Sequence, residues 1–159
     1  MNKAHVITVS DGVFHGTRED KSGQILVNVL GGGGFEVDAP EIVPDEVERI
    51  SEAILTAVTR GVDVVVTTGG TGLGPRDVTP QAVSSLLDYD VPGLGEAMRA
   101  AGLHSTPMAA LSRSGAGVKE RTLIINVPGS ARGAKESIEA VLPMLDHAVQ
   151  LLHGDTAHS

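Results

Sequence analysis

The segment at residues 67–80, TTGGTGLGPRDVTP, carries the residues of this chain with the clearest chemical use. Four glycines in the six residues 69–74 allow several backbone N–H groups to face an anion without obstruction by side chains, and phosphate is the obvious candidate. The segment is not a Walker A loop, because no Gly-Lys-Ser/Thr sequence ends it. Its alternate glycines Gly70, Gly72 and Gly74 miss the dinucleotide-binding spacing by one residue. A plain glycine-rich turn is the alternative to a phosphate cradle.

Two aspartates lie where they could serve the same ligand, although each also has a structural explanation. Asp77 ends the glycine-rich segment, and a carboxylate beside a phosphate site repels its ligand unless a cation bridges them. Asp77 therefore indicates Mg²⁺ with a nucleoside triphosphate, or else it helps to start a helix at Thr79 and Pro80. Asp45 with Glu48 has the spacing of an ordinary capping box, but its place just past a strand could bring it to the same cleft.

Length and composition exclude several other kinds of chemistry. The 159 residues suit one ordinary domain, and without cysteine the chain cannot build a disulfide framework, a thiolate zinc site or a cysteine nucleophile. Its six histidines show no metal-ligand spacing. A net charge of -8 argues against a broad nucleic-acid surface, and no apolar stretch is long enough for a membrane span or a signal peptide. We therefore expect a cytoplasmic protein that binds neither nucleic acid nor membrane.

Strand-like and helix-like stretches alternate along the chain, which predicts a single α/β domain over residues 1–153 and a flexible tail over 154–159. Short apolar runs predict strands, at 5–9, 35–43, 62–66 and 123–127. Apolar residues at helical spacing predict helices, at 24–30, 50–58, 79–87, 95–103 and 138–152. The tetraglycine 31–34 is expected to stop the first helix, and Thr79 to cap the third. The pattern is typical of a mainly parallel sheet, whose ligands bind beyond the carboxyl ends of the strands.

Several blocks of the chain match one known family in residue type and order. These blocks are TVSD (8–11), VPDE (43–46), VVVTTGGTGLGPRDVTP (64–80), PGLGE (92–96), ALSR (110–113) and NVPG (126–129). Together they closely resemble the MogA/MoaB family of molybdenum cofactor biosynthesis, and the resemblance runs from about His5 to Leu152, essentially the whole domain.

The resemblance implies a three-layer α/β/α fold of the molybdopterin-binding type, usually a homotrimer, that binds molybdopterin and MgATP. The family reaction is adenylyl transfer. The terminal phosphate of molybdopterin attacks the α-phosphorus of ATP, pyrophosphate leaves, and adenylylated molybdopterin goes on to metal insertion, which implies a molybdenum-insertion protein as a partner. Phosphoryl-type transfer needs positioning and charge neutralisation more than a protein nucleophile, which agrees with the residue types found.

The resemblance also implies roles for individual residues. The two acids regarded as catalytic in the family align with Asp45 and Asp77, which shifts both away from the capping interpretation and makes them the expected holders of Mg²⁺. Matching positions predict a set of residues that bind the substrates or their phosphates: Ser10, Gly69, Gly70, Thr71, Gly72, Glu96, Ser112, Arg113, Asn126, Pro128, Gly129 and Ser130.

Some of these positions have a structural alternative. Arg76 or Arg113 could stabilise charge on the transferred group, or either could be a solvated surface cation. We favour a site role for Arg113, because it lies in a matching block. Glu96 could equally be a helix acid favoured by the dipole, and Ser10 could do no more than satisfy backbone groups.

Two further functions stay open. Family membership does not guarantee turnover, so the chain could be a non-catalytic pterin-binding or scaffold subunit, although the retained acids argue against this. It could also be another nucleotide-processing enzyme, since the fold occurs in proteins that resemble the competence-damage family. The sequence departs from the family pattern at Ala131 and Arg132, where proline is usual, and in the loop 12–20. With only Phe14, Phe35 and Tyr89 as aromatic residues, ring recognition must rely mostly on backbone and polar contacts.

Overall fold

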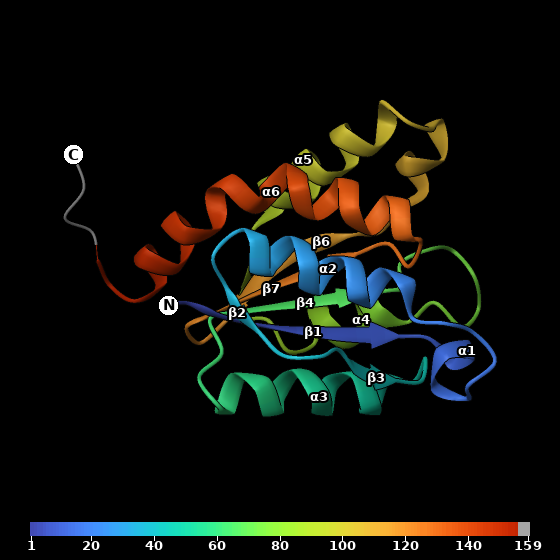
Figure 1. Cartoon of the computed structure of the whole chain (residues 1–159), viewed down its shortest axis with the longest axis horizontal. Coiled ribbons are helices and arrows are strands. Elements are labelled where there is room, and N and C mark those ends of the chain that lie inside the picture. The colour runs from blue at the N-terminus through green and yellow to red at the C-terminus, as the bar shows by residue number, and fades with distance from the viewer. Residues whose placement is uncertain (156–159) are drawn as a thin grey trace.

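The computed structural model of the chain describes residues 1–155, and its strands form one sheet (Figure 1). In sheet order the strands are β2 (Glu36–Val37), β1 (Lys3–Val9), β4 (Val64–Thr68), β7 (Thr122–Val127), β6 (Gly115–Lys119) and β5 (Tyr89–Asp90), and β3 (Glu41–Val43) also pairs with β1. Strands β2, β3 and β4 run parallel to β1, and β7 runs parallel to β4. Strand β6 forms a hairpin with β7 and runs antiparallel to it. Strand β5 in turn runs antiparallel to β6. The predicted mainly parallel sheet is confirmed.

Helices cover both faces of this sheet. They are α1 (Asp11–Phe14), α2 (Lys21–Gly32), α3 (Val47–Thr59), α4 (Thr79–Ser84), α5 (Pro92–Leu103), the 3-10 helix η1 (Pro107–Leu111) and α6 (Ala131–Leu152). Helices α2, α5 and α6 lie on one face and α3 on the other, where α4 packs beside it (Figure 1). The three layers are those expected for an α/β/α fold.

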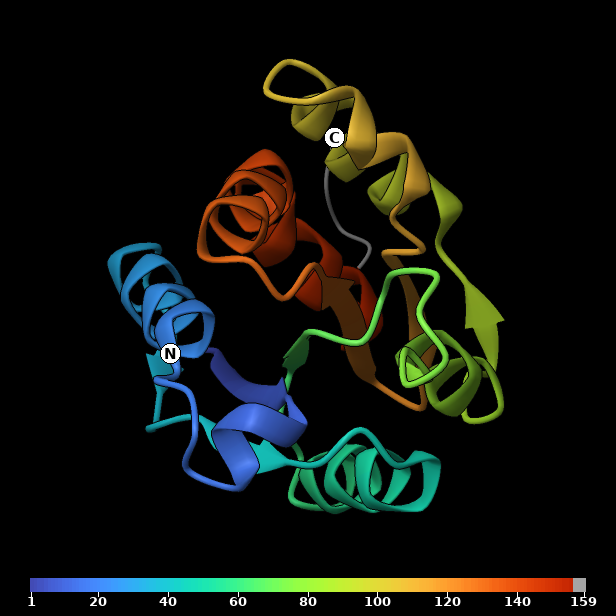
Figure 2. The same cartoon turned by 90° about the vertical axis from the view of Figure 1, so that its right-hand side faces the viewer.

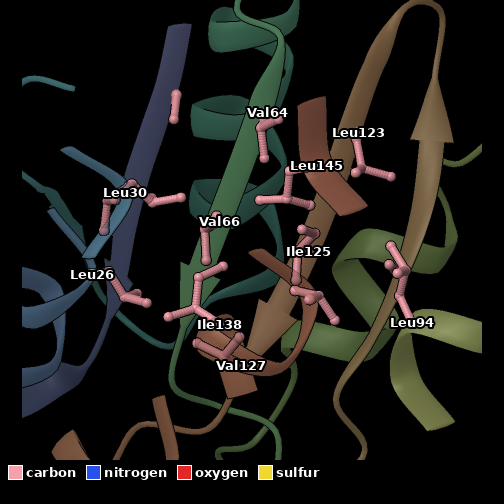
Figure 3. Packing of buried hydrophobic residues seen from close by; sticks show 14 of the residues in the cluster. Leu26, Leu30, Val64, Val66, Leu94, Leu123, Ile125, Val127, Ile138 and Leu145 are labelled. Carbon is pink, nitrogen blue, oxygen red and sulfur yellow. The ribbon is translucent and has the colours of Figure 1, made fainter. Parts of the chain in front are cut away.

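The central strands read as continuous apolar runs because both of their faces are buried. In β4, Val64 and Val66 point toward α6, whereas Val65 between them points toward α3. Figure 3 shows Val66 and Ile125 of neighbouring strands packed beneath Ile138 of α6. Successive side chains of these strands therefore pack into one or the other of two hydrophobic layers, and neither face of the central strands is exposed to solvent.

Several helix and strand boundaries differ from those predicted from the sequence. The expected strand at 35–43 is two short strands separated by Pro40, both paired with the same edge of β1. Helix α2 runs two residues into the tetraglycine and is closed by Gly33, so the glycines end the helix later than expected. Strand β6 lies in a stretch where no strand was predicted, because its glycines hide the apolar pattern.

The expected flexible tail at 154–159 is only partly described. The backbone N–H groups of Gly154 and Asp155 donate to the carbonyls of Leu151 and Gln150, so these two residues continue from the end of α6. Residues 156–159 lie outside the described part of the chain. Within residues 1–155, no helix is both long enough and apolar enough to cross a membrane.

Ile138 provides a test of how α6 is held on the sheet. The side chain is fully buried, whereas Met144 on the same helix is 41% exposed. Ile138→Ala leaves a cavity against β4 and β7, and we expect it to lower the free energy of unfolding by about 2–5 kcal/mol. Met144→Ala should lower it far less. Urea unfolding of the two variants measures the difference, and equal losses would contradict this packing.

Candidate active site

The turns that follow β1, β3, β4 and β7 surround one cleft at the carboxyl edge of the sheet, the edge that faces the viewer in Figure 2. The cleft has a volume of about 1110 Å³. It gathers most of the predicted site residues: Ser10, Asp45, Gly69, Gly70, Thr71, Gly72, Asp77, Ser112, Pro128, Gly129 and Ser130. Helices α2 and α6 both begin at its wall, and the N-terminus of α6, which is capped by the neutral Ser130, favours negatively charged ligands.

The loop after β4 requires glycine at its first two positions. Gly69 and Gly70 have φ of 106° and 68°, in the left-handed region that other residues avoid. A side chain on Gly69 would also collide with the carbonyl oxygen of Val9, and one on Gly70 with the hydroxyl of Thr79. These glycines therefore let the loop lie directly against β1 and the start of α4.

Side chains and backbone groups hold both ends of this loop. The N–H of Gly69 donates to the carbonyl of Val127 (3.1 Å), and the hydroxyl of Thr79 donates to the carbonyl of Gly69 (2.9 Å). Thr79 was expected to cap α4, but Val78 holds that position, because the Thr79 hydroxyl bonds to the loop instead.

The middle of the loop keeps its backbone donors free. Within residues 1–155, the N–H groups of Gly70, Thr71 and Gly72 donate to no other residue. The Thr71 hydroxyl also has no protein partner there, and it is open to the cleft, because no buried side-chain oxygen of these residues lacks a partner. Backbone donors in folded proteins are almost always satisfied, so a run of free ones lining a cleft indicates a ligand with several acceptor oxygens.

Arg113 clamps the loop from behind. Its Nε and Nη2 donate to the carbonyl of Gly72 (2.9 and 2.8 Å), Nη2 also donates to the carbonyl of Asp77 (2.8 Å), and its backbone N–H donates to the carbonyl of Thr71 (2.8 Å). A guanidinium group can make such a fork, and these bonds fix the loop between residues 71 and 77. In this structure, Arg113 therefore positions the loop and does not line the cleft.

Asp77 closes the loop on the cleft side. Its Oδ2 accepts a hydrogen bond from the N–H of Gly74 (2.8 Å), and a Cβ atom on Gly72 would lie only 3.0 Å from the same oxygen. The side chain makes no capping bond to α4, so the helix-start explanation for Asp77 is wrong. One carboxylate oxygen is thus held by the loop while Oδ1 has no protein donor in the described part of the chain.

Asp45 and Asp11 bind each other reciprocally. The N–H of Asp11 donates to Asp45 Oδ2 (2.8 Å), and the N–H of Asp45 donates to Asp11 Oδ1 (3.0 Å). Helix α3 instead begins after Glu46, with no side-chain cap, so the expected capping box of Asp45 with Glu48 does not form. This pairing joins the turn after β1 to the turn after β3 and aims Asp45 into the cleft.

Arg76 extends the same network. Its Nε and Nη2 donate to the two carboxylate oxygens of Asp11 (3.0 Å each), so its charge is directed at Asp11 and its guanidinium lies outside the cleft lining. No role was predicted for Asp11 from the sequence, although it ends the TVSD block (8–11) that matches the family pattern.

The pKa values of the two linked acids move in opposite directions. The hydrogen bonds from Arg76 lower the pKa of Asp11, so Asp11 is held as a carboxylate. Burial raises the pKa of Asp45, the N–H of Asp11 opposes that rise, and the negative charges of Asp11 and Asp77 add to it. Asp45 and Asp77 therefore lie close enough to repel each other, a cost that a bound cation would remove.

Three predicted site residues lie apart from the cleft. Glu96, Arg113 and Asn126 line a second pocket of about 360 Å³ between α4, α5 and β6. Asn126 points away from the cleft because side chains alternate along β7, and its Oδ1 accepts a hydrogen bond from the hydroxyl of Thr67 (2.8 Å). A direct contact between these three residues and a ligand in the cleft is not supported by their positions.

Three serines of the predicted set are partly engaged by the protein. Ser10 caps α1 by accepting from the N–H of Val13 (3.2 Å), and Ser130 caps α6 by accepting from the N–H of Gly133 (3.1 Å). The hydroxyl of Ser112 shares a hydrogen bond with that of Ser114 (2.7 Å). Each of these serines also lines the cleft, so capping and ligand contact are compatible at these positions.

A mainly parallel three-layer fold with a glycine loop, two carboxylates and two helix N-termini at its carboxyl edge defines a protein that binds phosphate-bearing small molecules. The sequence profile of one family, described as a probable molybdopterin binding domain, matches residues 5–147. The chain belongs to this family.

Named relatives agree with that membership. A molybdopterin adenylyltransferase of Helicobacter pylori (strain J99) is 38% identical over 154 residues, covering 94% of this chain and 87% of that protein. A molybdenum cofactor biosynthesis bifunctional protein of Synechococcus elongatus is 42% identical over 151 residues, 95% of this chain but 47% of that protein. The chain spans about half or less of the first curated relatives that it matches. The crystal structure of MoaB from Thermus thermophilus is 54% identical, with a TM-score of 0.90 over 97% of this chain and 98% of that one. The resemblance to the MogA/MoaB family is confirmed.

The raised pKa of Asp45 predicts how stability depends on pH. Since Asp45 binds its proton more tightly when folded, the wild type loses stability as pH rises through the folded-state value, which lies above 3.8. Asp45→Asn keeps an acceptor for the Asp11 N–H without the charge. We expect this variant to have the higher free energy of unfolding at neutral pH, with the difference shrinking toward pH 3.8.

Urea unfolding across this pH range measures the effect, with Asp38→Asn as the matched control, because Asp38 is exposed and outside the cleft. A variant that is equally stable at every pH would contradict the assigned cost of burying Asp45.

Proposed function

We propose that this chain transfers an adenylyl group from MgATP to molybdopterin. A phosphate oxygen of molybdopterin forms a bond to the α-phosphorus of ATP, the bond from that phosphorus to the bridging oxygen of the β-phosphate breaks, and pyrophosphate leaves. The observation that supports this most is the convergence of Asp45 and Asp77 on a loop with free backbone donors. The names of the close relatives support the same reaction.

The residues divide the work between holding and positioning. The N–H groups of Gly70, Thr71 and Gly72 hold phosphate oxygens, and the N-terminus of α6 adds favourable potential. Arg113 keeps the loop in place from behind, while Asp11 and Arg76 do the same for Asp45. No side chain has to act as a nucleophile, because the attacking group is a phosphate that is already ionised.

The donor set fits Mg²⁺ that arrives with the nucleotide. Among residues 1–155, no three acidic or histidine side chains form a group that could hold a metal alone. Mg²⁺ usually binds one or two carboxylates together with substrate phosphates and water, and Asp45 and Asp77 would supply those carboxylates. When bound, the ion would neutralise charge on the phosphates of ATP.

The setting of the reaction is part of the proposal. A homotrimer, a cytoplasmic location and a molybdenum-insertion partner follow from the family resemblance, and the cysteine-free composition suits a reducing compartment. A non-catalytic pterin-binding subunit would bind molybdopterin without releasing pyrophosphate. A different nucleotide-processing enzyme would instead hydrolyse a free dinucleotide, so one set of assays separates the three functions.

Asp77→Asn tests the proposed chemistry. Asparagine can still accept from the Gly74 N–H, so the loop keeps its shape while the charge that would meet the metal is lost. We expect pyrophosphate release from molybdopterin and MgATP to fall at least ~100-fold, the scale of an essential electrostatic group. Asp38→Asn should leave turnover unchanged. An unaltered rate in Asp77→Asn would refute the role of Asp77, and a wild type that binds molybdopterin without turnover would refute the enzyme.

Arg113→Lys tests positioning of the loop. Lysine carries the charge but cannot bridge the carbonyls of Gly72 and Asp77 with a planar fork. We expect kcat/KM to fall about 10- to 100-fold, the cost of small misplacements at a site. Faster amide hydrogen exchange across residues 70–77 should accompany the loss. Arg121→Lys, an exposed control, should change neither quantity. A slower reaction with unchanged exchange would argue against the clamp.

A further inference from the structure

The second pocket, between α4, α5 and β6, contains polar groups that the proposed reaction does not use. Its volume of about 360 Å³ falls within the range of small-molecule sites. Arg113, which holds the glycine loop, lines this pocket and not the cleft. A ligand in the second pocket would therefore contact the group that fixes the loop.

Asn126 directs a free donor into this pocket. The residue is only 5% exposed, and its Oδ1 accepts a hydrogen bond from the hydroxyl of Thr67 (2.8 Å), whereas Nδ2 makes no hydrogen bond within residues 1–155. No buried side-chain nitrogen of these residues lacks a partner, so Nδ2 must open into the pocket that Asn126 lines. A nearly buried amide whose donor faces a pocket indicates a ligand with an acceptor oxygen.

Two guanidinium groups in the same pocket also have free donors. Arg113 holds the loop through Nε and Nη2, which leaves Nη1 without a protein partner in the described part of the chain. Arg99 donates through Nη1 to the carbonyl of Ser114, and its Nη2 lies beside the pocket residue Gly95, where an added Cβ atom would be 3.2 Å away. Guanidinium N–H groups bind carboxylates and other oxyanions strongly, so the ligand that these donors suit is an anion.

Two acidic residues limit the charge of that anion. Asp90 and Glu96 line the pocket and are exposed, and within residues 1–155 neither side chain pairs with a cation. The two acids balance the charges of Arg99 and Arg113, so a divalent anion would be repelled more strongly than a monovalent one. The lining therefore favours a small monocarboxylate over the phosphates that suit the cleft.

We propose that the second pocket binds a small carboxylate ion on Asn126, Arg99 and Arg113, and that the bound ion steadies the glycine loop. The guanidinium of Arg113 would join the two, because a carboxylate on Nη1 restricts the same group that holds the carbonyls of Gly72 and Asp77. Ordering a group that two sites share couples those sites. An effect of the carboxylate on ATP binding rests on the function proposed above, whereas carboxylate binding itself does not.

Acetate is the probe for this site, and acetamide is its neutral control of the same shape. The side-chain amide signal of Asn126 in heteronuclear NMR spectra reports occupancy of the pocket without nucleotide or turnover. We expect acetate to shift this signal with a dissociation constant in the millimolar range, as suits so small a ligand. Acetamide should leave the signal unmoved, and divalent sulfate should bind here more weakly than acetate.

Three variants locate the site. Asn126→Asp keeps an acceptor for the Thr67 hydroxyl but loses the donor, and we expect it to weaken acetate binding about 10- to 100-fold, followed on the Arg113 Nε signal. A thermal melt checks that this variant is folded. Glu96→Gln should tighten acetate binding about two- to fivefold, because it removes an exposed repulsive charge, and misfolding cannot produce such a gain. Glu52→Gln, an exposed control outside both pockets, should change nothing.

Amide hydrogen exchange tests the link to the loop. Saturating acetate should slow exchange at Gly74 and Asp77, whose N–H groups are bonded within the loop, and acetamide should not. Equal shifts with acetamide, tighter binding of sulfate, unchanged acetate binding in Asn126→Asp, or loop exchange that bound acetate leaves unaltered would each overturn the proposal. An inactive wild type that shows the expected shifts and protection would refute the enzyme and still support this site.

Discussion

The parallel pairing of β1, β4 and β7 is the constraint on which the site depends. Thr8, Thr68 and Val127 are neighbours in register, so the turns that follow them leave the sheet side by side. The hydroxyl of Thr68 donates to the carbonyl of Pro128 (2.8 Å), and the N–H of Gly69 bonds to the carbonyl of Val127. Residues far apart in the chain meet at this edge because the parallel strands that precede them end side by side.

The acids at this edge are arranged for a ligand and not for the stability of the empty protein. Asp11 is neutralised by Arg76 and in turn holds Asp45, whose burial and acidic neighbours raise its pKa. Such an arrangement costs stability, since two carboxylates near one another and near a free Asp77 oxygen repel. Proteins retain such destabilising repulsion at sites where a bound ligand offsets it. The apolar layers on both faces of the sheet supply the folding stability that tolerates it.

Much of the architecture could be predicted from short-range patterns, and the contacts that hold the site could not. The apolar runs predicted the central strands, and parallel strands predicted that their carboxyl ends form a cleft. The fork of Arg113 on Gly72 joins residues 41 apart, and the pairing of Asp11 with Asp45 spans 34, separations at which no local pattern carries information. The prediction for Asn126 fails for another reason, because β7 is buried on both faces and its continuous apolar run does not show which face of the sheet each side chain takes.

The scarcity of aromatic residues decides how the cleft can recognise rings. Phe35 is buried in the core, and neither Phe14 nor Tyr89 lines the cleft. Ring faces must therefore rest on aliphatic and thioether groups, of which Met108 and Leu111 are exposed at its rim. Such side chains pack against the face of any flat ring and do not discriminate between pterin and adenine. Discrimination must therefore come from the ring edges, through contacts with polar side chains and free backbone donors of the cleft wall.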